Sequence, residues 1–259
     1  MTDTISVIVA TYNREDALDA VLRGLSRQSD RLFEVIVADD GSGAATARVV
    51  DTWLPRLGVA LKHVWHEDRG YRLAEIRNRA IHVSAGEVCI FLDGDCIPRP
   101  SFVAAHRRLA EPGWFVAGNR VLLTSELTER VLRERLEPEL WGPADWTRAR
   151  LRGEINRIAT LVSLPLGPLR AISATRWRGA RGCNLAIRKA DLFRVGGFDS
   201  GYIGWGLEDW DIIIRLIRCG VYRRDGRFAT GVLHLWHPEQ DRSHLPENQR
   251  RLYRVETSL

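Results

Sequence analysis

The first hundred residues alternate short apolar runs with amphipathic stretches. Nearly continuous apolar runs, which are typical of parallel strands buried on both faces, occupy residues 5–10, 33–38 and 87–92. A more polar run at 59–65 predicts a strand nearer an edge of the sheet. Apolar residues recur at helical spacing over residues 16–28, 46–54 and 73–83. This alternation predicts an α/β fold with a Rossmann-like, mostly parallel sheet flanked by helices.

Polar side chains follow each of the four predicted strands. They are Thr11 to Arg14 after the first strand, Asp39 and Asp40 after the second, His66 to Arg69 after the third, and Asp93 and Asp95 after the fourth. Ligands of such sheets bind beyond the carboxyl ends of the strands. We therefore expect a cleft lined with acceptor groups and arginines at this edge.

Asp93-Gly94-Asp95 directly follows the buried run at 88–92. Side chains two positions apart lie on one side of an extended chain, so we expect the two carboxylates to converge. Converged carboxylates usually hold a divalent cation or a hydroxylated ligand. A solvated Asp-Gly turn is the alternative that this segment alone leaves open.

His234 and His237 end a predicted strand at residues 231–238. Neutral imidazoles together with the Asp95 carboxylate would form a mixed nitrogen and oxygen site, which suits Mn²⁺ better than Ca²⁺. A bound diphosphate could complete the shell of such an ion, as it often does for Mg²⁺.

A glycine-rich turn, Gly204-Trp205-Gly206, precedes an amphipathic helix that opens with Glu208, Asp209 and Asp211. The helix dipole favours carboxylates in a first turn, which explains one or two of them without any function. Trp205 between two glycines is an open platform on which a sugar ring can stack. A carboxylate beside that platform could take a proton from a sugar hydroxyl.

Near the first two strand ends, Tyr12 could pack on a nucleobase and Asp39 could accept from its ring N–H, although a simple turn is the alternative for Asp39. No glycine-rich phosphate loop is present, which argues against nicotinamide cofactors and ATP-cradling loops.

Composition narrows the class of protein. The 259 residues are 45% hydrophobic, enough for one large domain or two small ones. No apolar run reaches ~18 residues and no leader is recognisable, so we expect a cytoplasmic protein, with peripheral membrane contact left open.

Four cysteines without paired spacing argue against zinc. The net charge of +5, carried almost entirely by arginine, favours anionic partners such as nucleotide diphosphates or lipids; no motif points to nucleic acid.

The middle of the chain is less regular. Residues 127–158 have helical spacing with breaks near Pro138 and Pro143. Residues 161–172 are apolar but interrupted by Pro165 and Pro168, too broken to span a membrane. A lid, an acceptor loop, an interfacial patch and an irregular buried connection all remain open for this segment.

Five segments carry a family resemblance: ISVIVATYNR, VIVADDGS, RLAEIRNRAI, VCIFLDGDC and RGCNLAIRKADLFRVGGFD with the later GWGLEDWD. Together they resemble the inverting nucleotide-sugar glycosyltransferases of family 2, which have the GT-A fold, with a galactosyltransferase-type second half. The resemblance implies one continuous domain, with a nucleotide-sugar-binding half at 1–120 and a smaller acceptor-binding and metal-completing half at 121–259.

The resemblance also implies roles for individual residues. The nucleotide-sugar site would comprise Thr11, Tyr12, Arg14, Asp39, Asp93 and Gly94, with Arg72, Arg77 and Asn78 near the diphosphate. Asp95 would bind Mn²⁺ or Mg²⁺ with His237 and with His234, which replaces the methionine of galactosyltransferase relatives. Asp209 would be the catalytic base beside Glu208. Trp205, Gly206 and Asp211 would shape the acceptor site.

The implied reaction moves a hexose or N-acetylhexosamine from a UDP-sugar to a hydroxyl of a glycan, a lipid-linked or a small-molecule acceptor. A single metal-assisted displacement would invert the anomeric centre. Two alternatives are a sugar-nucleotide-binding module without turnover and a nucleotidyltransferase. The latter usually carries a glycine-rich signature after the first strand, where this chain has Thr11 to Arg14.

Overall fold

A seven-stranded sheet forms the centre of the computed structural model, which describes residues 3–257. Its strands, in spatial order, are β3 (Leu61–Trp65), β2 (Phe33–Asp39), β1 (Ile5–Thr11), β4 (Val88–Asp93), β8 (Asn184–Arg188), β6 (Trp114–Ala117) and β9 (Tyr222–Asp225). β3, β2, β1 and β4 are parallel, whereas β8 runs antiparallel between β4 and β6. The mostly parallel sheet expected from the apolar runs is confirmed.

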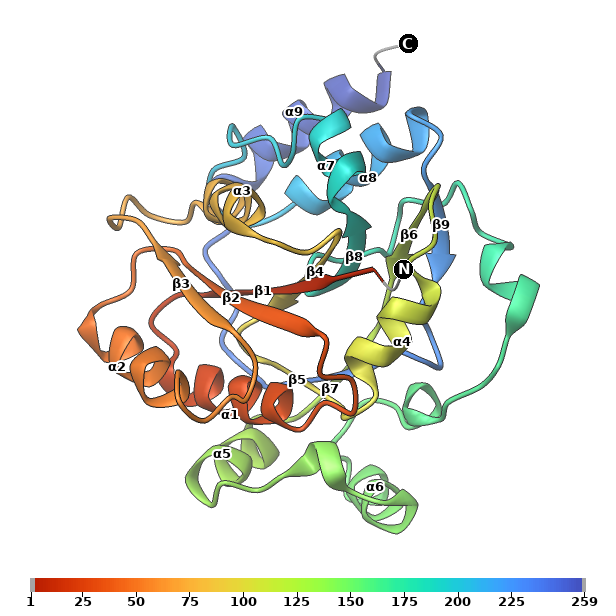
Figure 1. Cartoon of the computed structure of the whole chain (residues 1–259). Coiled ribbons are helices and arrows are strands. Elements are labelled where there is room, and N and C mark those ends of the chain that lie inside the picture. The colour runs from red at the N-terminus through yellow and green to blue at the C-terminus, as the bar shows by residue number, and fades with distance from the viewer. Residues whose placement is uncertain (1–2, 258–259) are drawn as a thin grey trace.

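Helices cover both faces of this sheet (Figure 1). A hydrophobic core lies on each face. On one face, α1 (Glu15–Ser26), α2 (Ala44–Trp53) and α4 (Phe102–Leu109) pack against the strands. On the other face, the strands are covered by α3 (Leu73–Val83), α7 (Lys189–Arg194) and α8 (Glu208–Arg218). Val7 and Val9 of β1 face the first core, and Ile8 faces the second, because successive strand residues point to opposite faces. The last helix, α9 (Leu245–Thr257), packs against α8.

A second, three-stranded sheet consists of β5 (Cys96–Pro98), β10 (Val232–His234) and β7 (Arg120–Leu122). β10 pairs antiparallel with β5, which sets His234 opposite Cys96, and the Leu235 N–H donates to the Asp95 carbonyl at 2.9 Å. This pairing brings the end of the chain back to the carboxyl edge of β4. Both sheets therefore contain strands from both halves of the sequence.

The middle segment forms short helices, three of which have a proline in their first two positions: α5 (Ser125–Arg133), η1 (Pro138–Leu140), α6 (Pro143–Leu151), η2 (Ala159–Leu161) and η3 (Gly167–Ala171). Leu169 and Ile172 are exposed to solvent, so the alternative of a buried connection is wrong. Within residues 3–257, no helix has the length and apolarity needed to cross a bilayer.

Candidate active site

Asp95, His234 and His237 gather at the carboxyl edge of β4. The Nε2 atom of His237 lies 3.4 Å from Asp95 Oδ2, and the Nε2 atom of His234 lies 3.8 Å from Asp95 Oδ1. One ligand atom from each residue falls within 4.8 Å of the others. Asp95 occupies the turn between β4 and β5, and the β5–β10 pairing delivers both imidazoles.

Burial sets the protonation of this cluster. It lowers the pKa of His234 to about 3, and the positive charge of Arg120 acts in the same direction, so the imidazole is neutral and able to bind a metal near pH 7. Burial also raises the pKa of Asp95, against the opposing charges of His237 and Arg14. A half-buried carboxylate beside two imidazoles gains from a cation, so these residues fit a divalent ion of the Mn²⁺ type.

Three arginines act electrostatically on the same cluster. Arg14 follows β1 and stabilises the charged form of Asp95, while Arg120 of β7 and Arg181 disfavour the charged form of His234. No motif marks Arg120 in the sequence, because only the β10–β7 pairing brings it here, whereas Arg181 opens the segment RGCNLAIRKADLFRVGGFD but had no role assigned to it. Arginines around a metal cluster form a setting for a diphosphate.

Asp93 and Asp95 make different contacts. Asp93 accepts a hydrogen bond from Nη2 of Arg77 at 3.0 Å, and Nη1 of the same guanidinium donates to Glu208 at 3.1 Å. Arg77 is only 1% exposed and lies against the rings of Phe91 and Phe198, which contact each other. The guanidinium thus connects the end of β4 to the start of α8.

Gly94 allows the turn after β4 to lie against β1. Its N–H donates to the Ala10 carbonyl at 2.7 Å, and a Cβ at this position would come within 2.8 Å of the same oxygen. The hydroxyl of Thr11, beside this contact, is buried and has no hydrogen-bond partner among the described residues. A larger residue at position 94 would push the turn away from β1.

Glu208 and Asp209 start α8 behind a turn of unusual backbone conformation. Gly204, Gly206 and Leu207 have φ values of +71°, +99° and +82°, a region that favours glycine and is strained at Leu207. Asn248 of α9, which is buried, donates to the carbonyls of Ile203, Trp205 and Gly206 at 3.0, 3.5 and 3.1 Å. The turn therefore depends on a helix far along the chain.

The two carboxylates at this helix start have raised pKa values. Burial and the charge of Asp209 raise the pKa of Glu208 to about 7. Burial also raises the pKa of Asp209, while the Gly182 N–H, 3.0 Å from Asp209 Oδ2, and Arg77 favour its charged form. A carboxylate whose pKa approaches neutrality is suited to accept a proton in a reaction near pH 7.

The predicted acceptor residues divide into two groups. Trp205 is 37% exposed as a residue, the guanidinium of Arg242 lies over its ring 5.0 Å from the centre, and Gly206 follows in the same turn. The Asp211 carboxylate is buried instead, where it accepts from Arg215 Nε at 2.7 Å and from Tyr202 at 3.4 Å. Trp205 and Gly206 lie beside the helix start, and Asp211 anchors the helix from within.

The residues predicted to meet the nucleotide lie at the ends of β1 and β2. Tyr12 is exposed, and its hydroxyl donates to Asp68 at 2.9 Å. Asp39 is buried, where Oδ1 accepts from the Ser42 N–H at 2.8 Å and Oδ2 lies 2.9 Å from His63 Nε2. These contacts orient the Asp39 carboxylate at the edge of the sheet.

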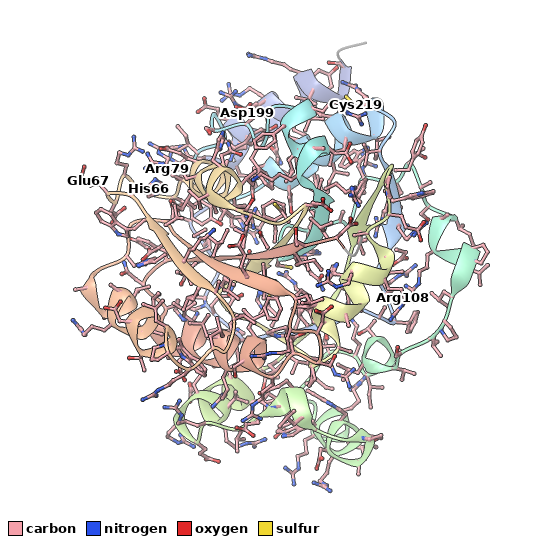
Figure 2. All side chains as sticks on the ribbon, viewed as in Figure 1. His66, Glu67, Arg79, Arg108, Asp199 and Cys219 are labelled. Atoms are coloured by element: carbon pink, nitrogen blue, oxygen red, sulfur yellow. The ribbon has the colours of Figure 1, made fainter. Side chains whose placement is uncertain are left out.

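Beyond the end of β3, His66 and Glu67 lie at one corner of the molecule (Figure 2). His66 Nε2 is 2.7 Å from Asp40 Oδ1, and the backbone N–H of Arg72 donates to Asp40 Oδ2 at 2.8 Å. The side-chain Nη1 of Arg72 is buried without a partner among the described residues. Arg72 therefore has a donor to offer to a ligand.

Asn78 was expected near the diphosphate, but its side chain binds the backbone of a turn instead. Its Nδ2 donates to the Phe198 carbonyl at 2.8 Å, and its Oδ1 accepts from the Phe198 N–H at 2.9 Å. The amide thus holds the turn after α7, and the structure does not bring it to the metal cluster.

Two family models match this chain, one over each set of motifs. The model described as glycosyl transferase family 2 matches residues 6–167. The model described as the N-terminal domain of galactosyltransferase matches residues 173–237.

Individual proteins give the same indication. The validoxylamine A glucosyltransferase of Streptomyces hygroscopicus subsp. jinggangensis is 33% identical over 242 residues, covering 88% of this chain and 54% of the relative. A solved structure of a mannosyltransferase from Pyrobaculum calidifontis in complex with GDP-Man and Mn²⁺ has a TM-score of 0.67 at 20% identity, over 98% of this chain and 65% of the other. GalNAc-T7 with UDP, GalNAc and Mn²⁺ has a TM-score of 0.63 at 17% identity, over 92% of this chain and 45% of the other. The chain spans about half the length of that curated glucosyltransferase.

Proposed function

Because the chain belongs to glycosyl transferase family 2 and has the GT-A fold, we propose that it moves a hexose or N-acetylhexosamine from a UDP-sugar to a hydroxyl acceptor with inversion. The observation that carries this proposal is the guanidinium of Arg77. It joins Asp93, at the edge where a donor would bind, to the Glu208–Asp209 pair. Groups that bind a leaving group and groups that accept a proton are thereby held at one site.

The donor end of the proposed site contains the metal cluster and the arginines. Asp95, His234 and His237 would hold Mn²⁺ or Mg²⁺, and a bound cation would stabilise charge on the departing diphosphate. Arg14, Arg120 and Arg181 act electrostatically on the cluster and would bind the diphosphate oxygens, a role that the family resemblance implied for Arg72, Arg77 and Asn78. Arg77 itself is already paired with two carboxylates.

The nucleoside would lie beyond β1 and β2. Tyr12 is exposed and available to pack on a base, and Asp39 is held at the sheet edge by Ser42 and His63. The two solved neighbours were obtained with different nucleotides, GDP-Man in one and UDP in the other. We propose UDP for this chain, and a comparison of nucleotides tests that choice.

Asp209 is the proposed base. Glu208 is more buried and already accepts from Arg77, whereas Asp209 is partly accessible and is oriented by the Gly182 N–H. The acceptor hydroxyl gives its proton to Asp209, and its oxygen forms a bond to the anomeric carbon as the bond from that carbon to the diphosphate oxygen breaks. The displacement inverts the anomeric centre, and the exposed ring of Trp205 offers a stacking surface for the acceptor sugar.

Nucleotide binding and transfer test this function separately. Thermal shifts with UDP, GDP and dTDP, each with and without Mn²⁺, should show the largest stabilisation for UDP with Mn²⁺. Transfer or hydrolysis of UDP-sugars, followed by mass spectrometry, should fall by a factor of about 10²–10⁴ in Asp209→Asn while the UDP shift persists. The exposed Asp51→Asn, on α2, serves as a matched control. Wild-type turnover by Asp209→Asn would refute the assigned base, and the lack of any nucleotide shift would refute the transferase.

A further inference from the structure

One stretch of the chain combines positive charge with exposed aliphatic side chains. Residues 155–181 contain five arginines and no aspartate or glutamate, although the chain as a whole has 33 acidic residues. Arg157, Arg176 and Arg178 of this stretch are exposed. The charge of the segment is therefore not balanced within its own sequence.

The same stretch exposes four large aliphatic side chains within eleven positions: Val162, Leu164, Leu169 and Ile172, which are 52%, 41%, 60% and 77% exposed. Single exposed apolar residues are ordinary on a protein surface. A cluster of them on one segment, next to exposed arginines, is characteristic of a surface that binds another protein or a membrane.

The backbone of this segment is held against the body of the protein. Leu164 N donates to the Phe228 carbonyl at 2.9 Å, and Arg223 N donates to the Ala174 carbonyl at 2.7 Å, which covers the free edge of β9. Arg170 is buried and donates to the carbonyls of Asp225, Arg227 and Leu164. The polar backbone thus faces inward, and the aliphatic side chains are presented outward by an anchored segment.

Other basic residues adjoin the segment. A cavity of about 580 Å³ lies between Leu164, Pro165 and the end of α4, where it is lined by Arg108 and Arg224. Arg224 is paired with Glu111 at 2.7 Å. Figure 2 shows Arg108 on α4, on the same side of the molecule as the segment that protrudes beyond β9 in Figure 1.

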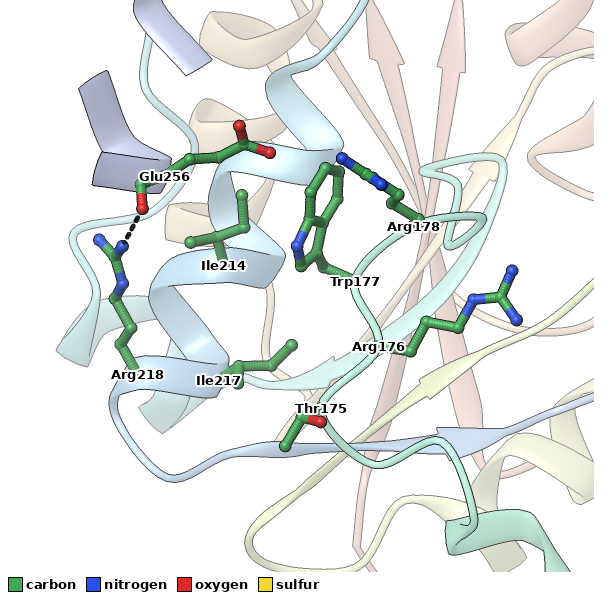
Figure 3. A pocket seen from close by; sticks show the side chains of 8 residues that line it. All are labelled: Thr175, Arg176, Trp177, Arg178, Ile214, Ile217, Arg218 and Glu256. Atoms are coloured by element: carbon green, nitrogen blue, oxygen red, sulfur yellow. Dashed lines mark hydrogen bonds between the residues drawn. The ribbon is translucent and has the colours of Figure 1, made fainter. Parts of the chain in front are cut away.

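At its other end the segment passes a cavity of about 610 Å³ beside α8. Figure 3 shows Arg176 extending away from α8, whereas Arg178 lies over the Trp177 ring, 4.7 Å from its centre. Arg176 is thus directed outward, as the aliphatic side chains of the segment are.

We propose that residues 162–178 form a docking surface for an anionic phospholipid membrane. Exposed aliphatic side chains enter the interface between headgroups and acyl chains, and adjacent arginines bind the phosphates. The segment has the two signals that stable peripheral binding requires, apolar insertion and positive charge. Its charge complements an anionic lipid surface, whereas a second copy of the same basic segment would repel it.

Vesicle co-sedimentation of the whole chain tests this surface. The protein should sediment with vesicles of phosphatidylcholine and phosphatidylglycerol, bind vesicles of phosphatidylcholine alone much more weakly, and detach as salt is raised. The double variant Leu169→Glu/Ile172→Glu should reduce binding by about tenfold or more. Leu54→Glu, at an exposed leucine that follows α2 on the opposite side of Figure 1, is the matched control and should bind as the wild type does.

A charge variant separates the two contributions. Arg176→Ala/Arg178→Ala should weaken binding to the anionic vesicles by about tenfold and leave the weak binding to neutral vesicles unchanged. Far-ultraviolet circular dichroism and the melting temperature establish that each variant is folded. Equal binding to both vesicle types, or wild-type binding by the double glutamate variant, would overturn the proposal. A dimer that this variant abolishes, without any vesicle binding, would assign the surface to a second copy instead.

Discussion

The guanidinium of Arg77 lies 3.1 Å from the carboxylate of Glu208, although 131 positions separate the two residues. The same guanidinium binds Asp93 at 3.0 Å. A buried arginine between two carboxylates is stable only while all three groups keep their partners. The pairing therefore couples the end of β4 to the helix that carries the proposed base.

Replacing Arg77 by alanine should destabilise the protein by about 3–5 kcal/mol, because the buried carboxylate of Glu208 and the half-buried carboxylate of Asp93 would lose their cation. Thermal or urea unfolding measures this loss. Arg79→Ala is the matched control, since its partner Glu75 is one helical turn away on an exposed face and the change should cost less than about 1 kcal/mol. An Arg77→Ala variant as stable as Arg79→Ala would mean that the buried pairing contributes nothing.

The acid side of the pH profile should stay in place in Glu208→Gln. The proposed base Asp209 works only without its proton, so activity falls as pH drops through its raised pKa. The charge of Asp209 helps to raise the pKa of Glu208 to about 7, so Asp209 loses its proton first and Glu208 is neutral where Asp209 titrates. A neutral glutamine at position 208 should therefore leave the acid limb of kcat/KM unchanged, measured over about pH 5–8, and remove any inflection near pH 7. Complete loss of activity in Glu208→Gln would instead identify Glu208 as the base.

His237→Ala should weaken Mn²⁺ binding by at least about tenfold, because one of three clustered ligand groups is lost. Titration of Mn²⁺, followed by electron paramagnetic resonance in the presence of UDP, measures this without any turnover. His82→Ala, whose ring contacts the Asn78 carbonyl on an exposed helix face, should bind as the wild type does. Equal affinities of the two variants would remove His237 from the proposed site.

Asn248→Ala should release the turn that precedes α8. The side chain satisfies three carbonyls of that turn, and leaving buried acceptors without donors costs about 1–3 kcal/mol. We expect lower thermal stability together with a lower kcat, since the base would be less well oriented. Asn156→Ala, at an exposed asparagine, provides the comparison. A kcat that stays at the wild-type value would show that the turn does not need Asn248.

The pattern of apolar residues predicted β1 to β4 and the helices between them to within a few positions. Strands buried on both faces and helices buried on one face leave clear periodic signals. β6, β7 and β9 span only three or four residues, too few for any period to show. The predicted strand at 231–238 shortens to β10, because Trp236 turns away to donate its N–H to Thr128.

Within the candidate site, the motifs identified groups that lie close in space but not how those groups pair. Asp95 and the two histidines cluster as their chemistry suggested. Arg77 was expected at the diphosphate, and only tertiary packing shows it between two carboxylates. Arg120 and Asn248 lie outside any motif, because their positions follow from strand pairing and helix packing over long sequence separations.

The location of β8 bears on how the protein is made. On a ribosome, β1 to β4 emerge first, yet the free edge of β4 acquires its neighbour only when residues 184–188 have been synthesised. At ~5–20 residues per second, the nascent chain waits on the order of ten seconds with an apolar strand edge unpaired. Such an edge can pair with other chains and lead to aggregation. Holdase chaperones that shield nascent chains should therefore raise the yield of folded protein more than slower induction of its expression does.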